Sequence, residues 1–429
     1  MLSQVEHLAR QLHRRWVPKW LESFSDHENG GFHERLNHQF KPLEMPRRRL
    51  LTQCRQLSIY AHNYVCAPAF MRAVSPEYLI SQFNYIHDNY FMPETSGWRF
   101  AIAMNGHEEE EVVYDLYAHA FVLFMCVWVH KATGSDQAHQ TAKDVVAFIQ
   151  AHFKDDVCGY KEQLDQNLKS IEQTRRQNPH MHLFESCLFA HENWPNDPEF
   201  SDMAHELKSL FTDYLWDVDA GAIAEFYSHD MQLHAEEGDF YEPGHHFEWV
   251  WLLNCYQNNF GEDHQIEGLK LKLLEFGNKF GRDTEFGGIY NAVNRQGEVV
   301  DEDKRIWPLT EALKANTIML SDKRDRDTIK DLLRDVTHML SSGYLHERGF
   351  WTEILNRDLS SKTDYMPGTT PYHLYFGIME ALQILKARGR SKSWRSWLIG
   401  VMYHSRQTLS DIMRIITGRH IRRSKAGQV

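Results

Sequence analysis

Histidine, arginine and glutamate residues recur at a nearly constant distance behind a series of glycines in this chain. Arg55, His245 and His373 each stand 24 residues after such a glycine, and His182 and Glu311 each stand 23 residues after one. An imidazole can take up or release a proton near neutral pH, and a guanidinium can stabilise negative charge that develops on an oxygen. Equivalent positions of a closed repeat lie on one ring, so the spacing predicts that these side chains converge on a site for proton transfer.

The short sequence segments around these residues indicate where helices begin. A proline or glycine stands just ahead of the polar residue in NPHMHLFE, EPGHHFEW, IWPLTEA and MPGTTPYH, as is typical of a loop that passes into a helix. We therefore expect the polar residues on first helical turns, where the helix dipole favours an anion. Glu248 follows His245 by three residues and shares its helix face. In the second unit the match is looser, with Tyr117 at 20 residues and His119 at 22 residues after the glycine.

Each candidate also has a structural interpretation. A single histidine beside proline or glycine is more often a capping or core residue, and only the repeated spacing favours a site. Arg55 could be a buried ion-pair partner, and Glu248 and Glu311 could be charges at helix starts. Trp307 could belong to the core. We interpret three further histidines as structural or supporting residues: His119, His180 and His246.

Six short loops centred on glycine divide the chain at regular intervals. The separations between successive glycines are 66, 62, 62, 67 and 61 residues. These glycines are Gly31, Gly97, Gly159, Gly221, Gly288 and Gly349. Such a period indicates a repeat protein, although the units share little side-chain identity. A unit of about 64 residues holds two helices of ordinary length and a loop or short hairpin.

Between the loops the apolar residues follow the period of a helix. The predicted helical ranges are 2–16, 112–127, 138–153, 203–215, 247–260, 266–276, 306–320, 328–340 and 372–385. Six helix pairs that close on themselves make an all-α (α/α)6 barrel, with inner helices around an axial cavity and short hairpins or loops at one end. An open helical solenoid is the alternative, but it would bury less aromatic surface and gives no reason for six units.

Composition limits the location and the partners of the protein. A chain of 429 residues is long for one domain, but a closed repeat can hold it, so we predict one catalytic domain over residues 1–429 with a short basic tail from about residue 419. The net charge of −12 disfavours binding to nucleic acid. The N-terminal segment is charged throughout, and no stretch approaches the roughly 18 uninterrupted apolar residues of a membrane span. We expect a cytoplasmic protein that binds neither nucleic acid nor a membrane.

Metal chemistry has weak support in the sequence. The six cysteines are scattered, with no CxxC pair, which is unlike a zinc knuckle or a disulfide framework. The 26 histidines include paired ones, but no carboxylate-rich set accompanies them and the HExxH motif is absent. We predict no metal and no other cofactor.

The order of the motifs resembles that of the N-acylglucosamine 2-epimerase superfamily, whose members are (α/α)6 barrels that act on aldoses without a metal. The motifs are GGFHERL at Gly30, RQL at Arg55, YAHAF at Tyr117, NPHMH at Asn178, PGHHFEW at Pro243, WPLTEA at Trp307 and TPYH at Thr370. The resemblance therefore spans nearly the whole chain. The segments RLLTQCRQLSIYAH and GFWTEILNRDL look most like the mannose isomerase branch.

This resemblance implies roles for the candidate residues. His245 and His373 would form an acid–base pair, Arg55 would stabilise negative oxygen charge, and Glu248 would support His245 and ring opening. The rest of the sugar pocket would consist of Tyr117, Asn178, His182, Trp307 and Glu311. The chemistry agrees, because removal of the C2 proton of an opened aldose needs a base with a pKa near 7 and a cation beside the developing enediolate. The acidic segment AEEGDFYEPG ahead of His245 favours a neutral hexose.

We therefore expect an aldose–ketose isomerase that interconverts D-mannose and D-fructose through an enediolate on the opened sugar. A cellobiose 2-epimerase is the next candidate. An N-acylglucosamine epimerase is third, because no glycine-rich nucleotide-binding loop is visible. A glycoside hydrolase that uses Glu248 and Glu311, or a binding protein without catalysis, is more distant. The oligomeric state is left open.

Overall fold

An outer and an inner ring of helices make up most of residues 1–382. The computed structural model describes residues 2–104, 112–320 and 326–389. The chain packs as two compact units, residues 1–382 and residues 383–429, and the first unit is the one described below. Of the second unit only residues 383–389 are described. The basic tail from about residue 419 therefore lies outside the described residues, and the single domain over residues 1–429 stays a prediction.

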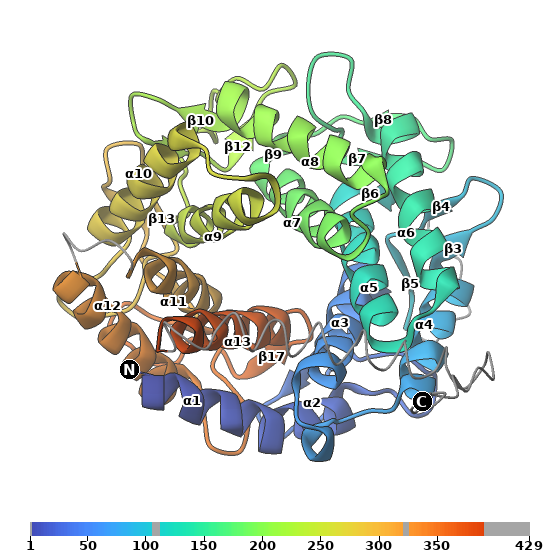
Figure 1. Cartoon of the computed structure of the whole chain (residues 1–429), viewed down its shortest axis with the longest axis horizontal. Helices are drawn as coiled ribbons and strands as arrows, with labels where there is room; N and C mark the ends of the chain where they lie inside the picture. The colour runs from blue at the N-terminus through green and yellow to red at the C-terminus, as the bar shows by residue number, and fades with distance from the viewer. Residues whose placement is uncertain (1, 105–111, 321–325, 390–429) are drawn as a thin grey trace, which may run out of the picture. The chain divides into compact units, whose positions relative to one another are not determined.

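Outer and inner helices alternate along the chain (Figure 1). The outer positions are occupied by α1 (Leu2–Gln11) with a π-turn (Leu12–Trp16) and α2 (Val17–Phe24), and by α4 (Pro76–Tyr90), α6 (Asp136–Phe148), α8 (Pro198–Leu210), α10 (His264–Phe280) and α12 (Arg326–Met339). The inner helices are α3 (Leu50–Cys66), α5 (Leu116–Thr133), α7 (Gln177–Asn193), α9 (Pro243–Phe260), α11 (Trp307–Met319) and α13 (Thr370–Gly389). Residues 370–382 of α13 belong to the first unit. The predicted all-α (α/α)6 architecture is confirmed.

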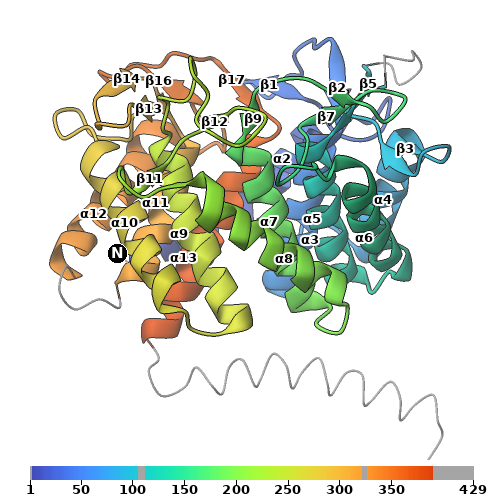
Figure 2. The same ribbon diagram turned by 90° about the horizontal axis from the view of Figure 1, so that it is seen from above.

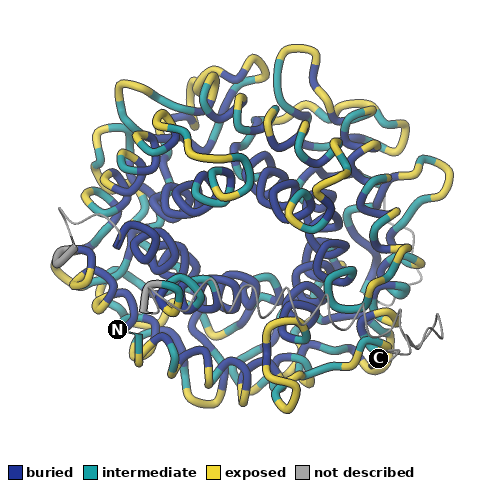
Figure 3. The backbone as a smooth tube through the Cα atoms, in the orientation of Figure 1, coloured by how far each residue is buried: buried dark blue, intermediate teal, exposed yellow. Residues whose placement is uncertain are grey.

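Burial distinguishes the two rings (Figure 3). The outer helix α4 buries one stripe, Leu79, Phe83, Ile86 and Tyr90, at the spacing of a helix with one face on a core. The inner helix α5 is buried over residues 116–129 except Tyr117, because it packs against α4 and α6 on one side and against α3 and α7 beside it. The inner helix α5 is therefore buried nearly all round, whereas the outer helix α4 is amphipathic.

Short strand pairs at one end of the helices tie each repeat to the next (Figure 2). The strand ahead of an inner helix pairs antiparallel with the following repeat: β2 (Arg47–Arg49) with β5 (Ala101–Ala103), β6 (Tyr114–Asp115) with β7 (Gln163–Leu164), β9 (Arg175–Arg176) with β12 (Phe226–Tyr227), and β15 (Lys304–Arg305) with β16 (Ile354–Leu355). A single bridge between Tyr241 and Val293 takes this place between the fourth and fifth repeats. Four further strand pairs are hairpins within a repeat: β3 (Phe91–Met92) with β4 (Gly97–Trp98), β7 with β8 (Ser170–Ile171), β10 (Trp216–Asp217) with β11 (Ala222–Ile223), and β13 (Ala292–Val293) with β14 (Val299–Asp301).

The sixth strand pair closes the ring. β17 (Tyr365–Pro367) of the last repeat pairs antiparallel with β1 (Arg35–Asn37) of the first. Further along the same seam His62 Nδ1 and Tyr375 Oη lie 3.2 Å apart in a hydrogen bond. An open solenoid would leave these partners apart, so the alternative architecture is wrong.

The six glycine loops connect the outer helices to the hairpins. An antiparallel residue pair closes each loop: 25 with 32, 91 with 98, 154 with 160, 216 with 223, 282 with 289 and 345 with 351. Gly31 has a φ of 67°, a backbone conformation in which glycine avoids the strain that a Cβ would cause. In the second loop Ser96, with a φ of 63°, takes this conformation in place of Gly97. The predicted period therefore corresponds to one repeated loop geometry.

The predicted helical ranges agree with the structure, with two qualifications. Residues 114–115 form β6, so the helix predicted from residue 112 begins at Leu116. Helix α2 lies beyond the end of the first predicted range, and three more helices were not predicted: α3, α4 and α7. The first and last of these bury polar residues such as Gln53 and His180 where an apolar period is expected, but α4 has a clear stripe that the sequence pattern contains.

Helix α5 qualifies the expectation about membrane spans. Among the described helices it is the one that is long and apolar enough, by length and composition, to cross a membrane. Of its 18-residue window, 72% is buried inside the protein. An inner helix of a helical ring meets the same criteria because its surroundings are apolar.

Candidate active site

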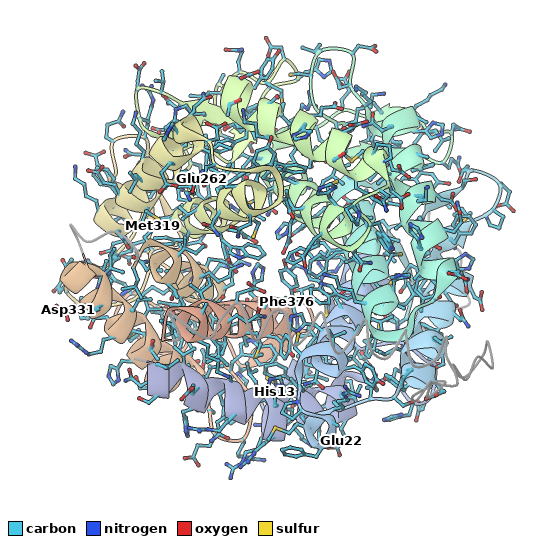
Figure 4. The ribbon with its side chains drawn as sticks, in the orientation of Figure 1. His13, Glu22, Glu262, Met319, Asp331 and Phe376 are labelled. Carbon is cyan, nitrogen blue, oxygen red and sulfur yellow. The ribbon has the colours of Figure 1, made fainter. Side chains whose placement is uncertain are left out.

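The first two turns of the inner helices bring the predicted site residues together around the ring axis, into which the inner helices project their side chains (Figure 4). The Trp307 ring lies between two of the predicted histidines, with its centroid 4.9 Å from that of His245 and 5.4 Å from that of His373. The centroids of His373 and His182 are 6.3 Å apart. Residues from α7, α9, α11 and α13 therefore meet at one place, as the spacing predicts.

His245 stands at the start of α9 and is held by two carboxylates. Its Nδ1 donates to Glu225 Oε1 at 2.7 Å and lies 3.4 Å from Glu242 Oε2. Burial disfavours the charged imidazole, but the charges of Glu225 and Glu242 outweigh it and raise the pKa of His245 to about 9. His245 is therefore protonated at neutral pH, and its Nε2–H is a proton donor. The family resemblance implied that Glu248 supports His245. The carboxylate that bonds the His245 ring is instead Glu225.

His373 has the opposite protonation state. Its Nδ1 lies 3.0 Å from Glu311 Oε1. Burial, together with the positive charges of Arg55 and Lys314, holds the pKa of His373 well below its ordinary value. The ring is therefore neutral. Because a carboxylate only accepts hydrogen bonds, Nδ1 carries the proton and Nε2 keeps a lone pair that can take up another.

Arg55 supplies positive charge without a carboxylate partner. Its Nη2 donates to Tyr117 Oη at 2.6 Å, and its guanidinium lies over the rings of Phe121 and Tyr372, at 4.3 and 4.7 Å. No carboxylate of the described residues forms an ion pair with it. The structural interpretation of Arg55 as an ion-pair partner is therefore wrong, and its charge is free to stabilise an oxyanion.

Glu248 is a fully buried acid on the second turn of α9. Neither of its carboxyl oxygens has a hydrogen-bond partner among the described residues, and His182 Nδ1 is 3.9 Å from Oε1. Burial and the charge of Glu311 raise the pKa of Glu248 well above its ordinary value. This environment does not fit an exposed charge at a helix start. It fits a neutral acid with free hydrogen-bonding capacity.

His182 belongs to a second cluster beside the first. Its Nδ1 lies 3.0 Å from Glu185 Oε2, and Tyr372 Oη donates to the other oxygen of Glu185. Burial raises the pKa of Glu185 to about 7. The ring of His182 packs 5.0 Å from that of Tyr117, so this cluster connects α5, α7 and α13.

Asn178 and Trp307 complete the predicted set. Asn178 is half-buried, and its Oδ1 lies in the interior with no hydrogen-bond partner within the described part of the chain. Trp307 packs so closely on α9 that a Cβ added to Gly244 would lie 2.4 Å from its ring. Trp307 thus forms the wall that both histidines share, beyond the core role considered for it.

Three other histidines are structural, as interpreted from the sequence. Nε2 of His119, His180 and His246 accepts the backbone N–H of a residue one or two positions after a loop glycine, at 3.0 to 3.2 Å. Each Nδ1 bonds the carbonyl four residues earlier. These rings fix a glycine loop to the inner helix of its repeat.

Five residues of the site are not predicted from the sequence: Glu225, Glu242, Glu185, Lys314 and Tyr372. For one of them a signal exists. A buried glutamate follows the loop glycine by three or four residues in four of the repeats, at Glu34, Glu162, Glu225 and Glu353. Glu34 and Glu162 bind the arginine ahead of the inner helix, Arg49 and Arg176. In the fourth repeat the residue directly ahead of the inner helix is Glu242 and not an arginine. Glu225 therefore bonds His245 instead.

Three groups of histidine and glutamate bring ligand-type atoms within 4.8 Å of one another. They are His182 with Glu185 and Glu248, Glu225 with Glu242 and His245, and Glu248 with Glu311 and His373. The carboxylate-rich set that the sequence did not reveal is therefore present. We assign no metal ligand, because Lys314 already neutralises Glu311 and each of the three histidines donates Nδ1–H to a glutamate.

The ring of helix pairs is that of an (α/α)6 barrel, and the two histidines on one tryptophan are an arrangement that could carry out proton transfer. The family model described as N-acylglucosamine 2-epimerase (GlcNAc 2-epimerase) matches residues 30–377, and the chain belongs to this family. It is thus an enzyme of the sugar isomerase and epimerase kind.

Three similar proteins illustrate the range of the family. A protein named mannose-6-phosphate isomerase from Rhizobium meliloti (strain 1021) is 27% identical over 394 residues, which are 89% of this chain and 98% of the relative. A cellobiose 2-epimerase from Bacteroides fragilis is 24% identical over 86% of this chain and 96% of its own. The crystal structure of a D-mannose isomerase superposes with a TM-score of 0.78 at 20% identity, over 88% of this chain and 97% of that one.

Proposed function

We propose that the enzyme interconverts D-mannose and D-fructose by moving a proton between C2 and C1 of the opened sugar. The observation that carries this proposal is the pair of histidines on Trp307, one protonated and one neutral. Glu225 and Glu242 favour the charged form of His245, whereas burial and the charge of Arg55 keep His373 neutral. A proton shuttle between adjacent carbons needs one general acid and one general base at the same time. Similarity to the relative named mannose-6-phosphate isomerase supports the reaction type, and similarity to the structure of a D-mannose isomerase supports the sugar as well.

In the proposed reaction His245 donates its Nε2 proton to the ring oxygen of the aldose as the bond from C1 to that oxygen breaks. The neutral His245 then takes up the proton of the O1 hydroxyl, which leaves the C1 carbonyl of the opened sugar. Nε2 of His373 then removes the proton from C2, and the C2–H electron pair forms the enediolate. Arg55 stabilises the negative charge on oxygen. His373 returns the same proton to C1, while His245 exchanges protons with O1 and O2. The product ketose has the same atoms as the substrate, so no external reductant or oxidant is needed.

A neutral hexose is the substrate that we propose. Glu225 and Glu242 flank His245, and the raised pKa values of Glu248 and Glu185 indicate that this interior already resists negative charge. A sugar phosphate would add close to two negative charges beside these carboxylates. The name of the Rhizobium relative contains a phosphorylated sugar, mannose 6-phosphate, and not a neutral one. Mannose 6-phosphate is therefore included in the test.

The test is incubation of D-mannose and, separately, mannose 6-phosphate with the enzyme in heavy water, with products and deuterium positions read by NMR. Fructose as the main product, with deuterium at C1 to the extent that the proton held by His373 exchanges with solvent, supports the proposal. Glucose labelled at C2 as the main early product would overturn it. Turnover of mannose 6-phosphate but not of D-mannose would be consistent with the proposed type of reaction and would overturn the proposal of a neutral substrate.

A sugar 2-epimerase is the second candidate, favoured by the similarity to the cellobiose 2-epimerase. It uses the same enediolate and differs only in the return of the proton to the opposite face of C2. Cellobiose in the same heavy-water experiment distinguishes the two, because an epimerase product retains its aldehyde carbon and carries deuterium at C2.

The hydrolase alternative has less support. A glycosidase needs one carboxyl group free to protonate the leaving oxygen and a second one free to act on carbon or water. Glu311 meets neither requirement, since Oε1 contacts His373 and Oε2 contacts Lys314.

A further inference from the structure

Lys314 is a buried cation that the proton-transfer steps above do not use. It stands one turn after Glu311 on α11 and is 1% exposed. Its Nζ lies 2.5 Å from Glu311 Oε2, in a direction that makes an ion pair and not a well-aligned hydrogen bond. The ammonium also lies over the Trp251 ring, 3.6 Å from the centroid. A lysine with so little exposure is rare unless a partner requires it.

Charged groups from every neighbouring inner helix face this ammonium. Three glutamates come from other helices: Glu248 from α9, Glu185 from α7 and Glu380 from α13. Together with Glu311 they interact favourably with the charged form of Lys314. The cations Arg55 and Lys314, with His245 and Arg305, act on His373. Lys314 is therefore the positive centre of a carboxylate cluster, and Glu311 is the member that it touches.

We propose that Lys314 is a positioning residue that keeps Glu311 ionised and so fixes the tautomer of His373. Glu311 links the two, with Oε2 on Lys314 and Oε1 on His373 Nδ1. An ionised Glu311 can only accept, so the His373 proton stays on Nδ1 and Nε2 remains a base. This inference rests on the proposed function for the role of Nε2.

Removal of the cation reverses this hydrogen bond. Burial already raises the pKa of Glu311, and the charge of Lys314 opposes that rise. Without Lys314, Glu311 takes up a proton and donates it to His373 Nδ1. The imidazole then carries its own proton on Nε2, where the sugar C2 proton should go, and the base is disabled.

The test compares Lys314→Met, Lys314→Arg and Lys270→Met. Methionine keeps the length of the side chain without its charge, and arginine keeps the charge. Lys270 is the matched control, because it is also buried and also pairs with a glutamate three residues earlier, Glu267 at 2.7 Å, but on the outer helix α10. Folding of all variants is checked by near-UV circular dichroism.

For Lys314→Met we expect kcat at pH 7 to fall by about 10²-fold, in the range of a lost general base, with KM changed far less. The acidic limb of kcat/KM should move up by about 1–3 pH units, because an opposite charge at this distance lowers a carboxyl pKa by that amount. Lys314→Arg should keep the limb near that of the unsubstituted enzyme, and Lys270→Met should not move it. A Lys314→Met profile with the unsubstituted limb, at any level of activity, overturns the proposal.

A second readout needs no turnover. In enzyme labelled with ring-15N histidine, long-range 1H–15N spectra report which ring nitrogen carries the proton, and the His373 signals are those missing from His373→Gln. We expect Nδ1–H in the unsubstituted enzyme and in Lys314→Arg, and Nε2–H in Lys314→Met. If no sugar is turned over but the tautomer changes, the proposed function fails and the role of Lys314 stands. If mannose is turned over and the tautomer is the same in all variants, the reverse holds.

Discussion

His245 and His373 are the same residue type on one tryptophan ring, and their partners alone give them opposite protonation states. Two carboxylates, Glu225 and Glu242, surround Nδ1 of His245. His373 has one carboxylate, already neutralised by Lys314, and the charge of Arg55. The groups around each imidazole and its carboxylate thus determine which histidine is the acid and which is the base. These groups lie on other repeats or further along a helix. This explains why residue types and spacing predict the pair, whereas the assignment of His373 as the base also needed the family resemblance.

Replacement of either histidine should abolish most activity and leave the fold intact. His245→Ala and His373→Ala each remove a general acid–base group, so we expect kcat to fall by about 10²–10⁴-fold. His229, whose side chain is 75% exposed, offers a histidine outside the site, and His229→Ala should be unchanged. Steady-state kinetics with D-mannose and far-UV circular dichroism measure both effects. Near-normal turnover of His373→Ala would sink the assignment of the base.

The pH dependence of the reaction should show the raised pKa of His245. The enzyme needs the protonated ring, so kcat/KM should fall as the pH rises through about 9. Stability has the same sign, because a pKa above the unfolded value of about 6.5 means stabilisation that is complete below that pH and lost through about 9. In Glu225→Gln the alkaline limb should move to lower pH, since one carboxylate is gone. An unmoved limb in a pH–rate profile would assign it to another group.

Activity should survive exhaustive treatment with EDTA. Two imidazoles and a guanidinium suffice for the proposed chemistry, and lysine occupies the centre of the carboxylate cluster where a cation would bind. The measurement is turnover of D-mannose before and after chelation, with divalent cations added back. Loss of activity that one cation restores would show that at least one of the three histidine–glutamate groups binds a metal.

At the scale of elements, equal counts from the loop glycines do not mean equal positions on the helices. Arg55 is the sixth residue of α3, His245 the third of α9 and His373 the fourth of α13. The hairpins between loop and helix differ in length, and this variation enters every count. The side chains still converge because all of them lie on the inward face of the first two turns. The sequence thus predicts the site and its end of the ring, but not which side chains touch.

The contact between α9 and α11 depends on a glycine. A Cβ at Gly244 would lie 2.4 Å from the Trp307 ring, so Gly244→Ala should destabilise the protein by about 1–3 kcal/mol through overpacking and displace Trp307 from both histidines. The control is Gly268→Ala on α10, where nothing lies within 4 Å of the added Cβ and alanine should stabilise by about 0.5–1 kcal/mol. Urea unfolding gives both free energies. Equal effects of the two substitutions would contradict the packing argument.

For the whole of residues 1–382, closure makes the first and last repeats neighbours. The glycine period and the helical apolar pattern were enough to predict six helix pairs in a ring. The sequence could not identify the seam, because strands of two or three residues carry too little pattern. The buried contact of Gln56 Nε2 with the carbonyl of Gly368, at 2.6 Å, joins residues 312 positions apart. Such contacts follow from closure and cannot be read from local sequence.

Closure should make the seam as stable as the opposite side of the ring. In an open array the terminal repeats have one neighbour and fray first, whereas the β1–β17 pair gives the first repeat a neighbour on both sides. We therefore expect amide hydrogen exchange in α3, at the seam, to require the same free energy of opening as exchange in α9, within about 1 kcal/mol. Gln56→Leu breaks the buried bond to Gly368 and should lower this value in α3 first, by about 1–3 kcal/mol. Mass spectrometry of peptides from the two helices measures both. Exchange in the unsubstituted protein that is far easier in α3 than in α9 would mean that the ring opens at the seam and behaves as a solenoid in solution.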